Sequence, residues 1–233
     1  MTASPGSVAL PLRASLYRVV ETQYAAATMR LVDSAEAQAV LEDALETSKP
    51  PVPPACRGLH YLLSTPFRYP PNPWPSRFRG PTDPGVFYAA EAQRTALAEV
   101  AHWRLKLLLD AIEVTALEPA AQTMFAVNVE ATIVDVAALP VTRQSSILDP
   151  RDYAAAQVWA REVRASGSQG IRYPSVRDRP AGICWAVFDP AAFRSKPRLA
   201  GNWLLRVTRQ GVHCRTVATP VVAFDFPAEH LQP

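Results

Sequence analysis

The sequence predicts an α+β fold, with a mixed β core and flanking helices. Apolar side chains recur at three- and four-residue spacing over residues 95–110, which predicts an amphipathic helix. From residue 184 onward, short β-branched and aromatic runs alternate with turn residues, which is typical of strands. Of the 233 residues, 48% are hydrophobic and 19% are charged, as in globular domains. Strands concentrated after the central helices favour an α+β arrangement.

The N-terminal part of the chain predicts one strand and one helix. Residues 1–14 are expected to form a loose leader, and residues 15–20 (SLYRVV) a first strand. Asp33 and Glu36 have the spacing of a helix N-cap and its N3 partner, and the helix should end before Pro50. The helix carries an apolar stripe made by Val40, Leu41, Ala44 and Leu45.

Residues 50–85 are dense in proline and predict an ordered loop laid across the domain. Proline lacks an amide donor and restricts φ, so a helix or a central strand is disfavoured here. The segment is too aromatic for a solvated linker, and its rings are expected to pack on the domain. These rings belong to Tyr61, Phe67, Tyr69, Trp74 and Phe78.

The remaining elements follow from periodicity and turn residues. A short strand is expected at residues 85–90, with Phe87 and Tyr88 on opposite faces, and one or two strands over residues 123–136. A further helix is predicted to open at Asp149-Pro150, to run through Arg164 and to end at Gly167. A hairpin turn is expected at 209–211. Strands are predicted over 184–188, 203–208, 212–217 and 221–226.

The composition excludes several classes of site. There are 9 glycines and 23 prolines, and neither GxGxxG nor GxxxxGK[ST] occurs, which excludes Rossmann and P-loop cradles. The 21 arginines against three lysines supply planar forks suited to phosphate. A net charge of only +3 predicts no general nucleic-acid surface, so direct binding of nucleic acid is not expected.

Cysteine and histidine spacing predicts no metal centre. Three cysteines without CxxC spacing indicate neither a disulfide framework nor a structural zinc site. The histidines form no HExxH motif, and His60, His102 and His213 are expected to have structural roles. No segment approaches the ~20 apolar residues of a membrane helix, and the start of the chain lacks the pattern of a signal peptide. We therefore expect a cytoplasmic protein without metal or membrane contact.

Two segments carry candidate chemistry. Residues 77–104 run from an arginine-rich loop into a strand and a helix, with Glu99 in the apolar stretch TALAEVA. A carboxylate among apolar neighbours is costly unless it has a partner or a task. The alternative is that Glu99 lies on the solvent face and Arg77 is an ordinary loop cation. In residues 170–178, Ser175 either bonds its own backbone in a turn or belongs to a site.

Together the two segments resemble the RES domain family, named for Arg, Glu and Ser. The matching stretches, in the family's order, are Leu16–Val19, Arg77-Phe78, Pro84–Ala89, Thr95–Glu99 and Gly170–Ser175. The resemblance implies a single RES domain over residues 15–228, with residues 50–85 as a proline-rich insert. The family commonly has Arg-Trp-Asn where this chain has Arg77-Phe78-Arg79, which leaves open whether Arg77 or Arg79 faces a ligand.

The resemblance implies an ADP-ribosyltransferase-like fold and a toxin of a bacterial toxin–antitoxin pair. Its substrate would be NAD, cleaved between nicotinamide and ribose by hydrolysis or phosphorolysis. A second interpretation is mono-ADP-ribosyl transfer to a protein, and a third is a RES-like binding or regulatory module without catalysis. The implied partner is an Xre-type helix-turn-helix antitoxin that covers the active site, with the Phe67–Phe78 loop as its docking surface. A homodimer or a hetero-oligomer is compatible with this expectation.

The residue types fit that chemistry. Glu99 could stabilise an oxocarbenium-like ribose, as carboxylates do in glycoside hydrolysis. Tyr88 offers a flat face for the nicotinamide ring, and Ser175 would hold a phosphate or the ribose. The predicted catalytic set is Glu99, Arg77, Tyr88 and Ser175. The guanidinium forks expected to bind the pyrophosphate belong to Arg18, Arg77 and Arg79.

Overall fold

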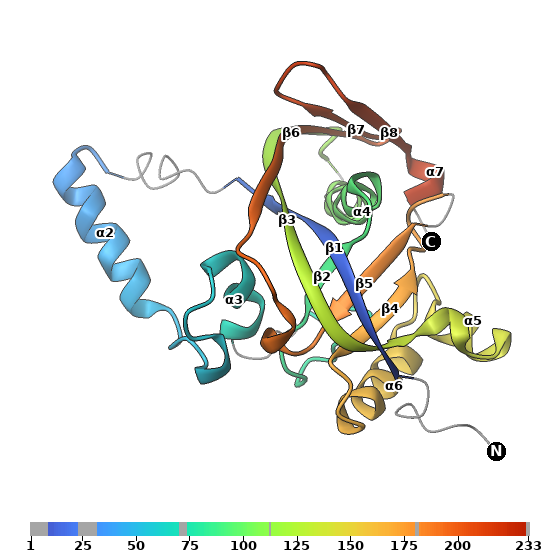
Figure 1. Cartoon of the computed structure of the whole chain (residues 1–233). Helices are drawn as coiled ribbons and strands as arrows, with labels where there is room; N and C mark the ends of the chain where they lie inside the picture. The colour runs from blue at the N-terminus through green and yellow to red at the C-terminus, as the bar shows by residue number, and fades with distance from the viewer. Residues whose placement is uncertain (1–8, 23–31, 70–73, 112, 180–181, 232–233) are drawn as a thin grey trace.

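The computed structural model describes residues 9–22, 32–69, 74–111, 113–179 and 182–231 (Figure 1). The α+β prediction is confirmed, because one mixed sheet is flanked by helices. The strands are β1 (Ala9–Glu21), β2 (Phe87–Ala90), β3 (Ala116–Asp135), β4 (Gly170–Pro174), β5 (Ile183–Val187), β6 (Arg198–Thr208), β7 (Gly211–Thr216) and β8 (Ala223–Pro227). The helices are α2 (Ala35–Ser48), α3 (Tyr61–Arg68), α4 (Gln93–Asp110), α5 (Val141–Ile147), α6 (Ala154–Ala165) and α7 (Ala228–Leu231).

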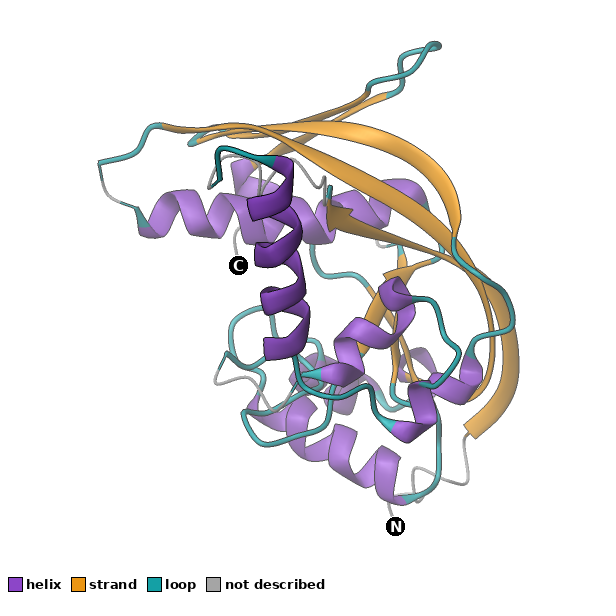
Figure 2. Cartoon of the chain, turned by 90° about the vertical axis from the view of Figure 1, so that its left-hand side faces the viewer, coloured by secondary structure: helices purple, strands orange, loops and turns teal. Residues whose placement is uncertain are grey.

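The sheet has the order β1-β2-β5-β4-β3-β6-β7-β8, and an added pairing of β1 with β3 closes the first five strands into a ring. β1 runs antiparallel to β3 over its whole length, from Ala9 opposite Val134 to Glu21 opposite Gln122. β4 is parallel to β3, and the other pairings are antiparallel. Figure 2 shows the sheet curving around the helices.

Strand alternation separates two apolar clusters. Phe87 is buried in one cluster, whereas the next residue, Tyr88, packs against the other, so their predicted opposite orientation is confirmed. Helix α4 packs against β1 and β6 and contributes Leu97, Leu105 and Leu108, each almost fully buried, to the cluster on the Tyr88 side. This packing fixes the position of α4, and therefore of its polar side chains, relative to β1 and β2.

Strand β1 is longer than its sequence pattern indicates. Residues 9–14, assigned to a leader, pair with residues 129–134 of β3, so the leader prediction is wrong there; residues 1–8 lie outside the described residues. Of the predicted residues 123–136, all but Val136 belong to a single strand that begins at Ala116. The local pattern is weak at Ala9–Ala14 because most of these side chains are half-buried or exposed. Pairing with a distant strand makes them extended.

The proline-rich segment contains a helix, which corrects the prediction of a loop throughout residues 50–85. Helix α3 tolerates Pro66 because packing of Leu63 in the second cluster offsets the missing amide donor. The hydroxyl of Thr65 also donates to the carbonyl of Tyr61, 2.7 Å away. The aromatic rings of the segment fall into two groups. Phe67 packs against Phe193, and Phe78 packs against Tyr173. The most exposed rings are Tyr61 (55%), Tyr69 (46%) and Trp74 (76%).

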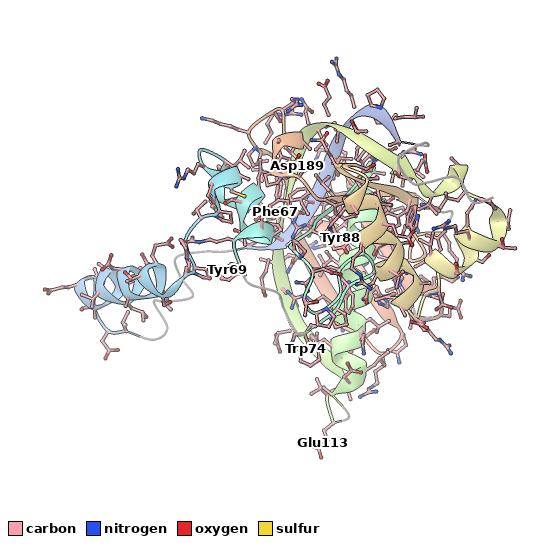
Figure 3. The ribbon with its side chains drawn as sticks, turned by 90° about the horizontal axis from the view of Figure 1, so that it is seen from below. Phe67, Tyr69, Trp74, Tyr88, Glu113 and Asp189 are labelled. Atoms are coloured by element: carbon pink, nitrogen blue, oxygen red, sulfur yellow. The ribbon has the colours of Figure 1, made fainter. Side chains whose placement is uncertain are left out.

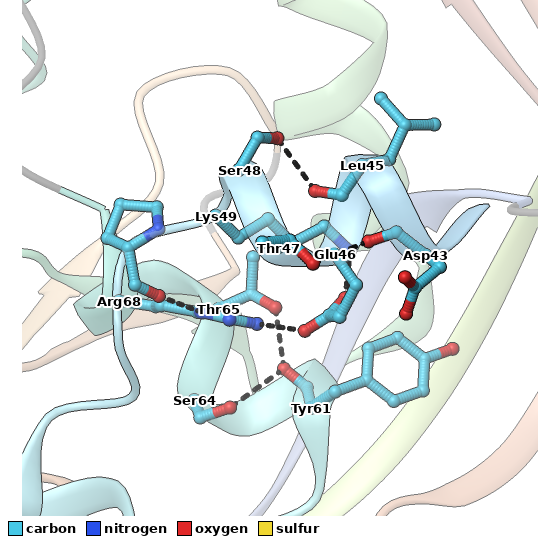
Figure 4. A network of polar contacts seen from close by, with 11 residues as sticks. Asp43, Leu45, Glu46, Thr47, Ser48, Lys49, Tyr61, Ser64, Thr65 and Arg68 are labelled. Carbon is cyan, nitrogen blue, oxygen red and sulfur yellow. Dashed lines mark hydrogen bonds and ion pairs between the residues drawn. The ribbon is translucent and has the colours of Figure 1, made fainter. Parts of the chain in front are cut away.

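Helix α2 extends from the body of the protein (Figure 1), and its predicted apolar stripe is exposed rather than buried. Val40 is 66% exposed and Leu45 is 45% exposed. At its C-terminal end, Glu46 accepts hydrogen bonds from Lys49 and from Arg68 of α3, at 2.5 and 3.0 Å (Figure 4). The ion pair with Arg68, rather than apolar packing, ties α2 to the domain.

The N-cap of α2 is Ser34 and not Asp33. Its hydroxyl accepts the amide of Ala37, 3.1 Å away. We expect Ser34→Ala to destabilise α2 locally by about 1 kcal/mol, because one end amide loses its acceptor. Amide hydrogen exchange of the first helical turn would measure this as faster exchange. Asp33→Ala is the matched control, and faster exchange in Asp33→Ala alone would contradict the assignment.

Helix α6 begins at Ala154, four residues after the predicted start at Pro150. The carboxylate of Asp149 accepts the amides of Arg151 and Asp152, both at 2.8 Å, and this turn delays the helix. The predicted end is confirmed, because Gly167 follows the helix with a φ of +80°.

The predicted hairpin turn before Gly211 and the predicted C-terminal strands are confirmed. The sequence analysis predicted no element at α5, α7 or β4.

Candidate active site

A cavity of about 240 Å³ lies between β1, β2 and α4, beside the loops that precede β2 and follow β4. Three arginines and one glutamate supply its charged lining: Arg18, Arg77, Arg177 and Glu99. The segments that carry these groups are distant in sequence and meet only in the folded chain. The excess of guanidinium groups makes the cavity suited to an anion.

Glu99 lines the cavity and Ser175 does not, yet the two side chains are in direct contact. The Ser175 hydroxyl donates to Glu99 Oε1 at 2.6 Å. Ser175 Oγ also accepts the amides of Arg177 and Asp178, both at 3.1 Å. Because these amides occupy the acceptor side of the hydroxyl, its hydrogen points to the carboxylate. Ser175 therefore bonds its own backbone, as the turn interpretation predicts, and also contacts Glu99.

The turn that carries Ser175 is fastened to the start of α4. The buried carboxylate of Asp178 forms an ion pair with Arg94 and accepts a hydrogen bond of 2.7 Å from the Thr95 hydroxyl. Arg94 and Thr95 lie in the first turn of α4, and Glu99 follows them on the same helix. This attachment holds Ser175 and Glu99 in register with each other.

Of the two arginines that the sequence left open, Arg77 lines the cavity and Arg79 does not. The Arg77 side chain is buried and donates to the carbonyls of Ile147 and Asp149, at 3.0 and 2.7 Å. Its guanidinium also lies over the ring of Tyr153. Arg79 instead donates to the carbonyl of Trp74, at 2.6 Å. Arg77 thus holds the 147–149 loop in place.

Arg18 is a half-buried cation without a carboxylate partner among the described residues. One nitrogen donates to the Tyr88 carbonyl at 2.7 Å, and the guanidinium lies 4.7 Å from the centre of the Phe87 ring. Its Nε is buried and has no hydrogen-bond partner in the described part of the chain. Burial lowers the pKa of Arg18 to about 10, so the group stays protonated at neutral pH. An anion in the cavity would compensate this charge.

Tyr88 is one of the residues that line the cavity. Its hydroxyl oxygen accepts the amide of Phe78 at 3.1 Å and lies 2.9 Å from the Ser76 hydroxyl. Burial raises the pKa of Tyr88, so the phenol remains neutral. The fixed hydroxyl holds the loop before β2 and sets the plane of the ring.

Several lining residues had no predicted site role. Arg177 could have been found two residues after Ser175, and Trp103 one helical turn after Glu99. The sequence around Tyr153 offers no comparable signal. Tyr173 and Cys184 also line the cavity, and the Cys184 thiol donates to Glu99 Oε1 at 3.7 Å. Burial raises the pKa of both groups well above their ordinary values, which keeps them neutral.

The sequence and the structure were compared with known proteins. The family model described as RES domain matches residues 52–207, more than half of the chain. The chain belongs to the RES domain family. One chain of a solved structure, described as the toxin–antitoxin complex MbcT–MbcA of M. tuberculosis, is 12% identical, with a TM-score of 0.45. That alignment covers 86% of this chain and 87% of the other. No curated protein matches the sequence significantly.

The matched part of the RES domain contains Arg77, Tyr88, Glu99 and Ser175, whereas Arg18 lies before it on β1. Within the described ranges, no helix is long and apolar enough to cross a membrane. In the same ranges, no group of three or more His, Cys, Asp or Glu side chains is placed to hold a metal ion.

His102 of the RES domain borders the cavity and is buried. Its Nδ1 lies 2.7 Å from the carbonyl oxygen of Leu231, which can only accept, so Nδ1 carries the hydrogen. Burial and the positive charges of Arg177, Lys106 and Arg77, opposed by the Leu231 carbonyl, together lower the pKa of His102 to about 4. The imidazole is therefore neutral at neutral pH.

We expect His102 to make the domain acid-sensitive. The unfolded chain takes up this proton near pH 6.5 and the folded chain only near pH 4, so stability falls as the pH falls between these values. The expected loss is about 2 kcal/mol of unfolding free energy. Urea unfolding at pH 7 and pH 4.5 would show a smaller loss in His102→Gln. The same substitution at exposed His213 is the control, and an equal loss in His102→Gln and the parent would contradict the prediction.

Proposed function

We propose that this RES domain is the toxin of a toxin–antitoxin pair and consumes NAD by cleaving the bond between nicotinamide and ribose. The observation that carries the proposal is one carboxylate, Glu99, in a cavity whose other charged groups are guanidiniums. NAD presents complementary charges, since its pyrophosphate is anionic and its nicotinamide ring is cationic. Membership of the RES family supports the same substrate.

The chemistry follows from the placement of Glu99 and Ser175. Nicotinamide leaves as a neutral molecule with the electron pair of the C–N bond, and positive charge develops on the ribose. The Glu99 carboxylate would stabilise that charge, while the Ser175 hydroxyl orients the carboxylate. Water then adds to the ribose carbon and loses a proton, which yields ADP-ribose. Phosphate as the acceptor would yield ADP-ribose 1″-phosphate.

The arginines have separate proposed roles. Arg18 and Arg177 would bind the anionic part of NAD, while Arg77 contributes charge and holds the 147–149 loop. Arg79 has no proposed contact with NAD, because it does not line the cavity. That Arg77 and Glu99 line one cavity favours an enzyme over a binding module. Transfer of ADP-ribose to a protein remains the second candidate, since it needs the same cavity and a different acceptor.

The proposed partner is an Xre-type helix-turn-helix antitoxin that covers the cavity. The Phe67–Phe78 loop was expected to dock it, but Phe67 and Phe78 themselves pack inside the protein. Tyr69 and Trp74 are the exposed aromatic residues available from the described part of that loop, and residues 70–73 lie outside the described residues. An antitoxin complex in which both rings stay solvent-exposed would refute this docking surface.

The test uses purified protein without antitoxin. Incubation with NAD, with and without phosphate, is followed by chromatographic measurement of nicotinamide and of the sugar product. ADP-ribose indicates hydrolysis, and a phosphate-dependent 1″-phosphate indicates phosphorolysis. Labelled NAD in a cell lysate would place label on protein if transfer is the reaction. No nicotinamide release under any of these conditions would refute the proposal.

A further inference from the structure

A second cavity, of about 470 Å³, adjoins the first along α4. His102, Trp103, Tyr153 and Arg177 line both cavities, so the two are direct neighbours. Glu99 lines only the first of them. A ligand with its reacting atom beside Glu99 would have to pass these four residues to reach the second cavity.

The second cavity combines positive charge with apolar walls. Among the described residues, Lys106, Arg151 and Arg177 line it together with one carboxylate, Asp110, which forms a 3.0 Å ion pair with Lys106. Leucine side chains supply apolar lining: Leu105, Leu109 and Leu231. Cations beside an apolar wall suit a phosphate that is attached to a flat, uncharged ring system.

Trp103 supplies a stacking surface at the junction of the cavities. Trp103 lines both cavities and is 47% exposed, so part of the indole is accessible to a ligand. Glu99, Trp103 and Lys106 are spaced four and three residues apart and share one face of α4. Lys106 lies about 10 Å along the helix axis from Glu99, a span that a dinucleotide can bridge.

We propose that the second cavity binds the adenylate half of the substrate. The adenine would stack on Trp103, and Lys106 and Arg151 would lie beside the adjoining phosphate. This inference rests on the proposed function, because it assigns the nicotinamide riboside half to the Glu99 cavity. A cavity of about 240 Å³ is smaller than typical pockets for whole ligands, so the other half requires the neighbouring space.

The first test compares NAD with nicotinamide mononucleotide, which has the same reacting bond and lacks the adenylate. In Lys106→Gln and in Lys106→Gln/Arg151→Gln, the ratio of kcat/KM for NAD to that for the mononucleotide should fall about tenfold, because a charge-assisted contact is lost. Trp103→Ala should lower the ratio by a similar factor, since base stacking on an aromatic contributes about as much. An unchanged ratio in all three variants would overturn the proposal.

The second test measures AMP binding by calorimetry and does not depend on turnover. AMP should bind the parent protein and bind the double variant about tenfold more weakly. Lys196→Gln is the matched control. It removes one positive charge from an exposed lysine that lines neither cavity. Thermal melting verifies that each variant is folded.

The two tests separate the subsite from the reaction. AMP binding that weakens in the double variant, without nicotinamide release from NAD, would support the subsite and refute the proposed function. NAD cleavage without AMP binding, and with an unchanged substrate ratio, would refute the subsite alone.

Discussion

Glu99→Gln is expected to abolish nicotinamide release from NAD and to leave the fold intact. Glutamine keeps the size of the side chain and an oxygen that can accept the Ser175 hydroxyl, but it removes the negative charge. One positioned electrostatic group contributes about 10²- to 10³-fold to a rate, so we expect a fall of at least that size. The measurement is kcat by chromatography of nicotinamide, with thermal melting for the fold.

The controls for this prediction separate charge from orientation. Glu113→Gln removes the same charge at an exposed position outside the cavity (Figure 3) and should leave kcat unchanged. Ser175→Ala keeps the Glu99 charge but removes the hydroxyl that orients it and that accepts the amides of Arg177 and Asp178, so a smaller fall of roughly tenfold is expected. Full activity in Glu99→Gln would remove Glu99 from the chemistry. A large loss of melting temperature would assign it a structural role instead.

Gly85→Ala is expected to destabilise the domain by about 3 kcal/mol, the largest effect on stability that we predict. A Cβ at residue 85 would lie 1.9 Å from the carbonyl oxygen of Pro66 and 3.0 Å from the Cα of Phe67. Both neighbours are backbone atoms of α3, so no side-chain rotation can relieve the contact. Helix α3 would have to move away from β2. Urea denaturation would measure the change.

Gly167→Ala is the control that measures the cost of replacing a glycine where no steric contact results. Residue 167 has a φ of +80° and no atom within 4 Å of its added Cβ, so its substitution carries backbone strain without a contact. We expect a loss of about 1 kcal/mol there. If Gly85→Ala loses no more than Gly167→Ala, the close approach of α3 to β2 is not a constraint on stability.

The elements that the sequence predicted well are those whose signals are local. Helix α4 follows from apolar spacing at three and four residues, and its observed span of Gln93–Asp110 differs from the prediction by two residues at one end. The turn after α6 follows from Gly167, because glycine adopts positive φ without steric conflict. Such preferences act between neighbouring residues and need no knowledge of the rest of the chain.

The elements that the sequence missed depend on distant partners. Residues 9–14 are a strand because β3 lies beside them, and β4 is a strand because it lies between β3 and β5. Helix α3 forms despite Pro66 because Leu63 is buried in the second cluster. In each case a non-local contact outweighs the local preference, which a sequence pattern cannot report.

For the site, the resemblance of two segments to the RES family predicted Arg77, Tyr88, Glu99 and Ser175 as a set, because residue type and order can be compared along the chain. Only the tertiary structure decided that Arg77 rather than Arg79 lines the cavity, and that Glu99 contacts Ser175 across 76 residues. It also decided that Trp103 and Lys106 open onto a second cavity. The physical reason is that charge, burial and distance belong to side chains brought together by folding, whereas a sequence orders them only along the chain.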